Sequence, residues 1–236
     1  MKLTRKKLFL IVLIAFLILG IPFKVMILIE GFTEVRPVNA IPPLAGLICG
    51  PAGTAACGLG NLLTDLFGTF NETSILGFFS NMLAAYVPYR LWHIYSSETP
   101  NVHRNINIFK YIFISFTAAL TVAWTLGFGL FYVFGQWIEN IYTYIFFNNF
   151  GFSVALGLPV FIMLTTDEIN IECAGRPKKY VLLKNERLRH IVPIVYTALM
   201  AVFLVRVCGY HLSPADHPLF HVLSAAGAVG LILILI

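Results

Sequence analysis

The chain has 236 residues, of which 58% are hydrophobic and only 11% are charged, and its mean hydropathy is +0.84. A soluble domain carries about 25% charged residues, so this composition argues against one and predicts that lipid surrounds most of the surface. The net charge of +5 does not indicate a nucleic-acid partner, because the basic residues lie near the ends of apolar runs, where they orient membrane helices.

Apolar runs along the chain predict an all-α membrane protein. The first run, from Leu8 to Ile29, is longer than the core of a signal peptide, so it is interpreted as a first membrane helix that contains Lys24. The expected helices lie at about 7–30, 38–50, 52–69, 74–96, 107–135, 140–166, 190–210 and 217–236. The second and third are short for membrane spans, so they either tilt or form a broken pair around Gly50 and Pro51.

These helices predict three regions. Residues 1–166 form a six-helix membrane core, residues 167–189 form a basic loop, and residues 190–236 add two transmembrane helices.

The distribution of charge predicts the orientation in the membrane. With the N-terminus in the cytoplasm, 13 of the 16 basic residues lie on the cytoplasmic side, and only Lys24, Arg36 and Arg206 lie outside or within the membrane. This asymmetry follows the positive-inside rule and predicts a multi-pass protein of the cell membrane with both termini in the cytoplasm.

The segment from Glu34 to Gly68 combines apolar character with polar side chains and many glycines and prolines. Polar groups at membrane depth are costly, so they usually face a cavity or a partner. Gly and Pro allow helices to break and to pack closely. We therefore expect this segment to form the floor of a small-molecule site.

The same segment resembles the substrate-binding S components of energy-coupling factor (ECF) transporters. The resemblance rests on Arg36-Pro37 through Pro42-Pro43, on Gly50-Pro51 and on the Asn61-Leu62-Leu63-Thr64-Asp65 pattern, with support from 77–81 and 86–89. It covers about residues 1–166 and implies a subunit that binds a vitamin-like micronutrient from outside. It also implies partners, namely a transmembrane coupling subunit and two ATPase subunits, and no catalytic role for this chain.

Several polar and aromatic residues are candidates for ligand contact. Arg36 can hold a carboxylate or phosphate through its guanidinium, or it can pair with Glu34 or reach the lipid head groups. Amide side chains can bond a heterocycle or join helices, and Tyr86 can stack on a flat ligand. Asp65 is expected to cap the next turn or to bond Asn61 rather than to contact the ligand. The candidate substrate-binding residues are Arg36, Asn39, Asn61, Asn81, Tyr86, Asn148 and Asn149. Few ionisable groups are expected to be buried, and Trp92 is assigned to the membrane interface.

Two alternatives to an uptake subunit remain open, a metal-dependent intramembrane enzyme and a structural subunit of a larger membrane complex. His217 and His221 are spaced to share a metal on one helix face, with His211 nearby, or they belong to an ordinary polar loop. Cys49 and Cys57 can ligate a metal-linked cofactor or simply pack as small residues. No metal and no cofactor are predicted, and the glycines of 46–60 are expected to let the first three helices dock closely onto a partner.

Overall fold

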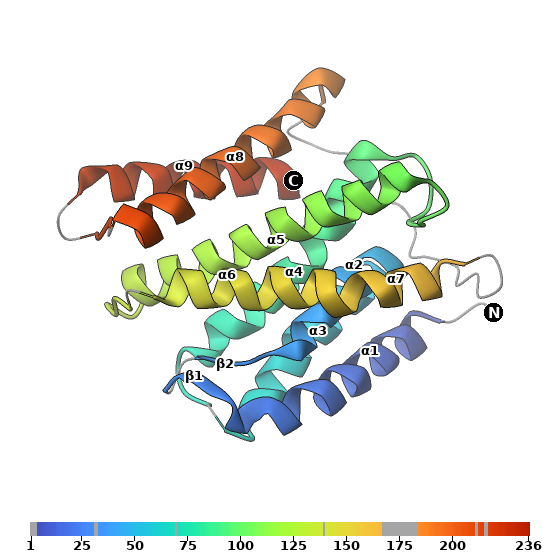
Figure 1. Cartoon of the computed structure of the whole chain (residues 1–236), viewed down its shortest axis with the longest axis horizontal. Helices are drawn as coiled ribbons and strands as arrows, with labels where there is room; N and C mark the ends of the chain where they lie inside the picture. Colours follow the sequence, from blue (N-terminus) through green and yellow to red (C-terminus); the bar gives the residue numbers. More distant parts are fainter. Residues whose placement is uncertain are drawn as a thin grey trace.

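A computed structural model describes residues 4–30, 33–68, 70–138, 140–166, 184–210, 212–214 and 217–236. Nearly all of its regular structure is helical (Figure 1). The helices in chain order are α1 (Arg5–Gly20), α2 (Ile41–Cys49), α3 (Pro51–Asp65), α4 (Ser74–Tyr95), α5 (Asn105–Tyr132), α6 (Ile141–Phe152), α7 (Leu158–Leu164), α8 (Glu186–Tyr210) and α9 (Pro218–Leu235). Short 3₁₀ turns, Ile21–Val25 and Pro37–Ala40, follow α1 and precede α2.

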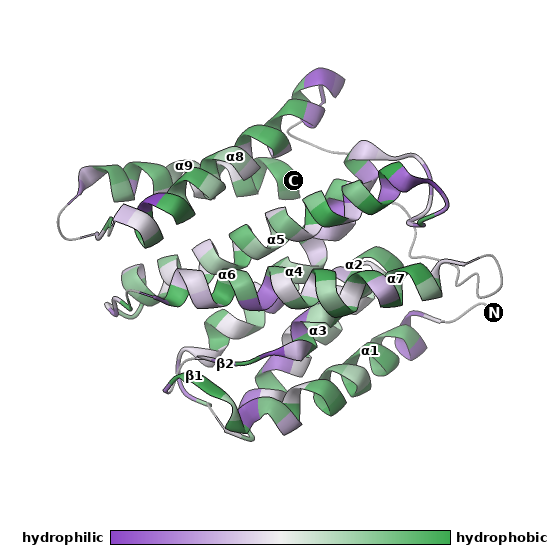
Figure 2. Ribbon diagram, in the orientation of Figure 1, coloured by the Kyte–Doolittle hydropathy of each residue, from purple (hydrophilic) through white to green (hydrophobic). Residues whose placement is uncertain are grey.

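Among the described residues, five helical segments are long and apolar enough to cross a membrane. They are Arg5–Val25, Asn105–Tyr132, Ile141–Leu164, Glu186–Tyr210 and Pro218–Leu235. Their ribbons are largely hydrophobic along their length, while hydrophilic residues gather at helix ends and around the segment after β2 (Figure 2). The chain is therefore an α-helical, multi-pass membrane protein.

The helix α4 lies at the centre of the bundle and contacts α2, α3, α5, α8 and α9. Neighbouring helices shield it from lipid, which explains how it carries Asn81 and Arg90 as buried residues. Arg90 Nε donates to the backbone oxygen of Ile234 at the end of α9, 3.2 Å away. Trp92 was expected at the membrane interface, and this is wrong. Its ring is fully buried, and its indole nitrogen donates to the backbone oxygen of Glu98 because the turn after α4 folds back over it.

The helices α2 and α3 form the broken pair that was one of the two expectations for this region. Gly50 makes the turn between them with φ +55°, a conformation that favours glycine. At 1.5 Å per residue, the nine residues of α2 extend about 14 Å, roughly half of the hydrocarbon thickness. Arg36, which precedes α2, contacts Asn61 near the end of α3, so both ends of this helical pair lie at the same end of the bundle.

The glycines of this helical pair pack inside the chain. A side chain at Gly46 would overlap the backbone carbonyl of Ala85 on α4, one at Gly53 would overlap α2, and one at Gly60 would meet Phe16 on α1. The expectation that these glycines form a docking surface for a partner is therefore wrong. Their small size lets α1, α2, α3 and α4 approach one another.

The first predicted helix, 7–30, ends earlier than expected. After the 3₁₀ turn Ile21–Val25 the chain becomes extended as β1 (Ile27–Ile29), which pairs antiparallel with β2 (Thr33–Glu34), Ile27 opposite Glu34. The backbone N–H of Val35 donates to the oxygen of Met26 at 2.8 Å and extends the pairing. This β1–β2 hairpin turns Lys24 and Glu34 towards each other, and the apolar run alone did not reveal it.

The helices α6 and α7 are joined by a π-helical turn, Ser153–Gly157, so that the predicted span 140–166 is one continuous helical element with a local widening. Pro159 follows the turn and cannot donate a helical hydrogen bond, which explains the break in the regular pattern. The Ser153 hydroxyl donates to the Asn39 backbone oxygen at 3.3 Å and fastens this helix to the start of α2.

Candidate functional site

Four charged side chains meet at the end of the bundle where the β1–β2 hairpin lies. Lys24 Nζ is 2.8 Å from a carboxylate oxygen of Glu34 and 2.6 Å from one of Asp65, and all three side chains are at least 92% buried. Arg36 Nη1 lies 3.8 Å from the same Glu34 oxygen. The cluster contains two positive and two negative charges, so it is neutral as a whole. We call Lys24, Glu34, Arg36 and Asp65 the charged cluster.

Two amides extend the charged cluster towards the centre of the bundle. Asn61 Oδ1 accepts hydrogen bonds from Arg36 Nη2 and, at 3.0 Å, from Asn81 Nδ2, while Asn61 Nδ2 donates to Asp65 at 3.1 Å. Asn81 Nδ2 also donates to the backbone oxygen of Gly77 at 3.0 Å. A side chain at Gly77 would collide with the Asn61 amide, so this glycine makes room for the network.

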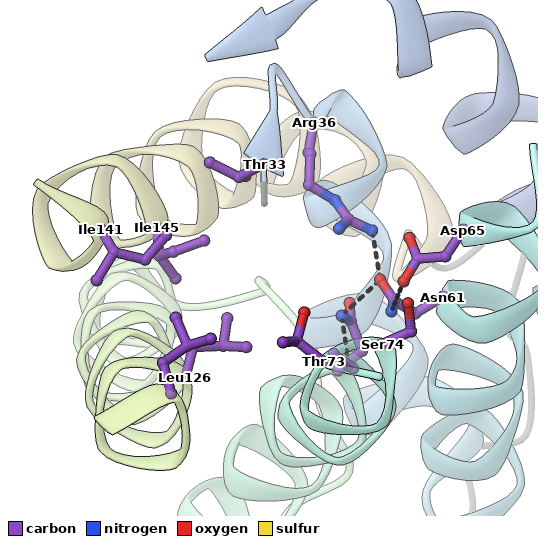
Figure 3. A pocket seen from close by; sticks show the side chains of 12 residues that line it. Thr33, Arg36, Asn61, Asp65, Thr73, Ser74, Leu126, Ile141 and Ile145 are labelled. Carbon is purple, nitrogen blue, oxygen red and sulfur yellow. Dashed lines mark hydrogen bonds between the residues drawn. The ribbon is translucent and has the colours of Figure 1, made fainter. Parts of the chain in front are cut away.

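These side chains border a cavity of about 50 Å³ (Figure 3). Arg36, Asn61 and Asp65 lie on one side of it, and Leu126, Ile141 and Ile145 lie on the other. The lining comes from β2, from the segment between β2 and α2, and from the helices α3, α4, α5 and α6. The lining residues are Thr33, Arg36, Asn61, Asp65, Thr73, Ser74, Gly77, Asn81, Leu126, Leu130, Ile141 and Ile145. The cavity therefore has one polar wall and one apolar wall.

Some polar atoms of this region are buried without a hydrogen-bond partner in the described part of the chain. They are Arg36 Nε, Asn81 Oδ1 and Glu34 Oε2. Buried polar groups are normally paired, because an unpaired donor or acceptor costs about 1–3 kcal/mol. Arg36 and Asn81, which also line the cavity, thus each keep one polar atom that a ligand could pair when the cavity widens.

The candidate residues from the sequence fall into two groups. Arg36, Asn61 and Asn81 line the cavity, and Asp65 bonds Asn61, one of the two roles expected for it, and lines the cavity too. Asn39, Tyr86, Asn148 and Asn149 do not line it. These four have other surroundings. Asn39 is buried at the start of α2, Tyr86 lies beside Tyr89 with ring centroids 5.9 Å apart, and Asn149 Nδ2 donates to its own helix at the Ile145 oxygen.

Asn148 holds the β1–β2 hairpin in place. Its Nδ2 donates to the Glu34 backbone oxygen at 2.7 Å, and its Oδ1 accepts from the Arg36 backbone N–H at 3.1 Å. This amide therefore fixes the chain on both sides of Val35 to α6. At least one of the two adjacent amides, Asn148 and Asn149, was expected to point inward, and both are buried.

Lys24 and Glu34 are the members of this site that sequence reasoning missed as site residues, and the expectation of few buried ionisable groups is wrong here. Charges of both signs within one apolar segment of the sequence are a signal of pairing. The partners could not be assigned from spacing, because the hairpin and the α2–α3 pair bring them together only in the folded chain.

The two larger hollows are apolar. One, of about 370 Å³, is lined by residues of α1, α2, α7 and the π-helical turn, and the other, of about 320 Å³, lies between α5, α6 and α8. Their exposed surface offers no polar group to orient a ligand, so their size does not make them better candidates than the polar cavity.

The described residues contain no group of three or more His, Cys, Asp or Glu side chains that could hold a metal ion. His217 precedes α9 instead of sharing a helix face with His221. The two ring nitrogens of His221 already face Tyr132 and the Pro214 backbone oxygen. Cys49 and Cys57 are buried in the core, whereas His211 and Cys173 lie outside the described residues.

Comparisons of the chain with protein-family models, with curated proteins and with solved structures find no match. The function is therefore argued from the geometry of the polar cavity and from the resemblance in sequence.

Proposed function

We propose that this chain is the membrane-embedded binding subunit of an uptake system for a small organic micronutrient, driven by a separate ATP-hydrolysing module. The observation that carries this proposal is the polar cavity, which six segments build at one end of an otherwise apolar bundle. The charged cluster and its amides are costly to bury, so a binding role accounts for their presence better than packing does.

The cavity lies at the end of the bundle opposite to most of the basic residues. The connection before α5 meets the end of α7, where His103 Nε2 lies 3.0 Å from the Thr165 oxygen, and Arg104 and Lys184 belong to this basic end. By the positive-inside rule this end faces the cytoplasm, so the cavity faces outward, where a nutrient arrives. Both termini are then cytoplasmic, and the protein resides in the cell membrane.

The volume of the cavity indicates a closed form. A cavity of about 50 Å³ holds a few water molecules, whereas pockets for cofactor-sized ligands measure about 300–1,000 Å³. Binding of a ligand of that size therefore requires the cavity to widen. Among the residues that the structure describes, Asn148 and the ion pairs of Glu34 fasten β2 near the cavity.

The energy for uptake is assigned to a partner. The sequence has no GxxxxGK[ST] phosphate-binding loop, and the S components that it resembles work with a transmembrane coupling subunit and two ATPases.

Reconstitution tests this proposal. The chain alone, and the assembly purified gently from its host, are placed in liposomes, and both receive a nutrient-rich medium extract with ATP present on the cytoplasmic side. We expect the assembly to accumulate at least one organic solute that the chain alone only binds. Accumulation of that solute by the chain alone, or no accumulation by the assembly, would contradict the proposal.

A further inference from the structure

We infer that the cavity selects an uncharged cyclic amide, such as a lactam or ureide ring, by an adjacent acceptor and donor on one edge of the ring. This inference rests on the proposed function, since it names the class of solute that the uptake subunit binds. It follows from three properties of the cavity, namely its unpaired polar atoms, its balance of charge and its apolar wall.

The unpaired atoms form a complementary pair. Among the residues that the structure describes, Arg36 Nε–H has no acceptor and Asn81 Oδ1 has no donor. Both side chains line the cavity and donate to the same atom, Asn61 Oδ1, so one small molecule in the cavity can contact both of them. A cyclic amide presents C=O beside N–H, so its carbonyl can accept from Arg36 while its N–H donates to Asn81.

The balance of charge favours a neutral ligand. Arg36 was a candidate to hold a carboxylate or phosphate, but its charge is already balanced by Glu34 at 3.8 Å. Asp65 is likewise balanced by Lys24 at 2.6 Å. An anion or a cation would therefore bring one uncompensated charge into a buried, neutral cluster, which is unfavourable in a medium of low polarity.

The opposite wall provides only van der Waals contact. It consists of Leu126 and Leu130 from α5 and Ile141 and Ile145 from α6. A ring with one polar edge and an apolar body satisfies both walls, whereas a solute polar on all sides would leave groups unpaired against these aliphatic side chains.

The test compares defined probes on the full chain in lipid nanodiscs. The uncharged cyclic amides are uracil, 2-pyridone and hydantoin, and the comparison compounds are 1,3-dimethyluracil, which lacks the N–H donor, orotate, an anion, and benzamidine, a cation. We expect at least one cyclic amide to bind and to raise the unfolding temperature. Because loss of one hydrogen bond to a buried group weakens binding about tenfold or more, 1,3-dimethyluracil should bind at least that much more weakly than uracil.

Three variants locate the binding. Arg36→Lys keeps the positive charge but removes Nε, so it should weaken binding of the cyclic amide about tenfold without creating affinity for orotate. Asn81→Ala should weaken it similarly. Asn149→Ala removes a buried amide that bonds only its own helix in the structure and lies outside the cavity lining, so binding should be unchanged.

Certain results would overturn this inference. The inference is wrong if orotate or benzamidine binds more tightly than every cyclic amide. It is also wrong if uracil and 1,3-dimethyluracil bind equally, or if none of the three cyclic amides binds. A charged solute accumulated by the assembly in liposomes would reject the ligand class and leave the uptake role intact. A cyclic amide that binds but is never accumulated would reject the uptake role instead.

Discussion

Replacing Lys24 with Met tests whether the charged cluster is a buried electrostatic unit. Lys24 Nζ is within 2.8 Å of carboxylates from two different segments, and its side chain is only 3% exposed. Removing one partner of a buried ion pair costs about 3–5 kcal/mol, because the remaining charge stays buried without compensation. Since Lys24→Met removes a positive charge that contacts both Asp65 and Glu34, we expect a loss of unfolding free energy in this range.

The double variant Lys24→Met/Asp65→Asn separates lost attraction from uncompensated charge. It removes one charge of each sign, and Glu34 keeps Arg36 at 3.8 Å, so it should be less destabilised than Lys24→Met alone. Unfolding free energies come from SDS titration in mixed micelles followed by circular dichroism. Lys184→Met, at an exposed lysine, is the control and should stay within about 0.5 kcal/mol of the parent. A cost below about 1 kcal/mol for Lys24→Met, the value of an exposed pair, would refute the reasoning.

Other variants test the packing, the hairpin contact and the orientation. Gly46→Ala should lower the unfolding free energy by about 1–3 kcal/mol, because its methyl group meets the α4 backbone, whereas Gly151→Ala, with open space around it, should not destabilise; equal costs would contradict the packing. Asn148→Ala should lower the unfolding free energy by about 1–3 kcal/mol in the same SDS titration. It should also speed the amide hydrogen exchange of β2, and an unchanged exchange rate would contradict the role of Asn148 in holding this strand. In a variant whose native cysteines are replaced, an impermeant thiol reagent should label Glu72→Cys on intact cells but not Lys184→Cys; the reverse pattern would invert the orientation.

The sequence predicted the positions of most helices well, because apolar runs and their Gly, Pro and polar boundaries are local signals. The span 74–96 corresponds to Ser74–Tyr95, and 217–236 corresponds to Pro218–Leu235. The error at 7–30 has a physical cause. An apolar run such as Ile27–Ile29 suits a strand as well as a helix, and pairing with Thr33–Glu34 decides between them.

The candidate site was predictable only in part. Arg36, Asn61 and Asn81 were identified because polar side chains in an apolar segment are costly, and this property is visible in the sequence. The partner of each charge was not visible, because Lys24 and Asp65 are 41 residues apart and meet only after the α2–α3 pair folds back beside α1. Asn148 and Asn149 are neighbours in sequence, yet they have different roles, which depend on the face of α6 that each occupies.

Native mass spectrometry of the full chain released gently from the membranes of its host tests the central claim most directly, namely that the polar cavity binds a small organic ligand. We expect the parent and Asn149→Ala to carry one organic molecule per chain and Arg36→Ala and Asn81→Ala to carry much less, with all four equally folded. A molecule retained equally by all four would place binding elsewhere, and a parent without any bound molecule, even after incubation with host extract, would contradict the account.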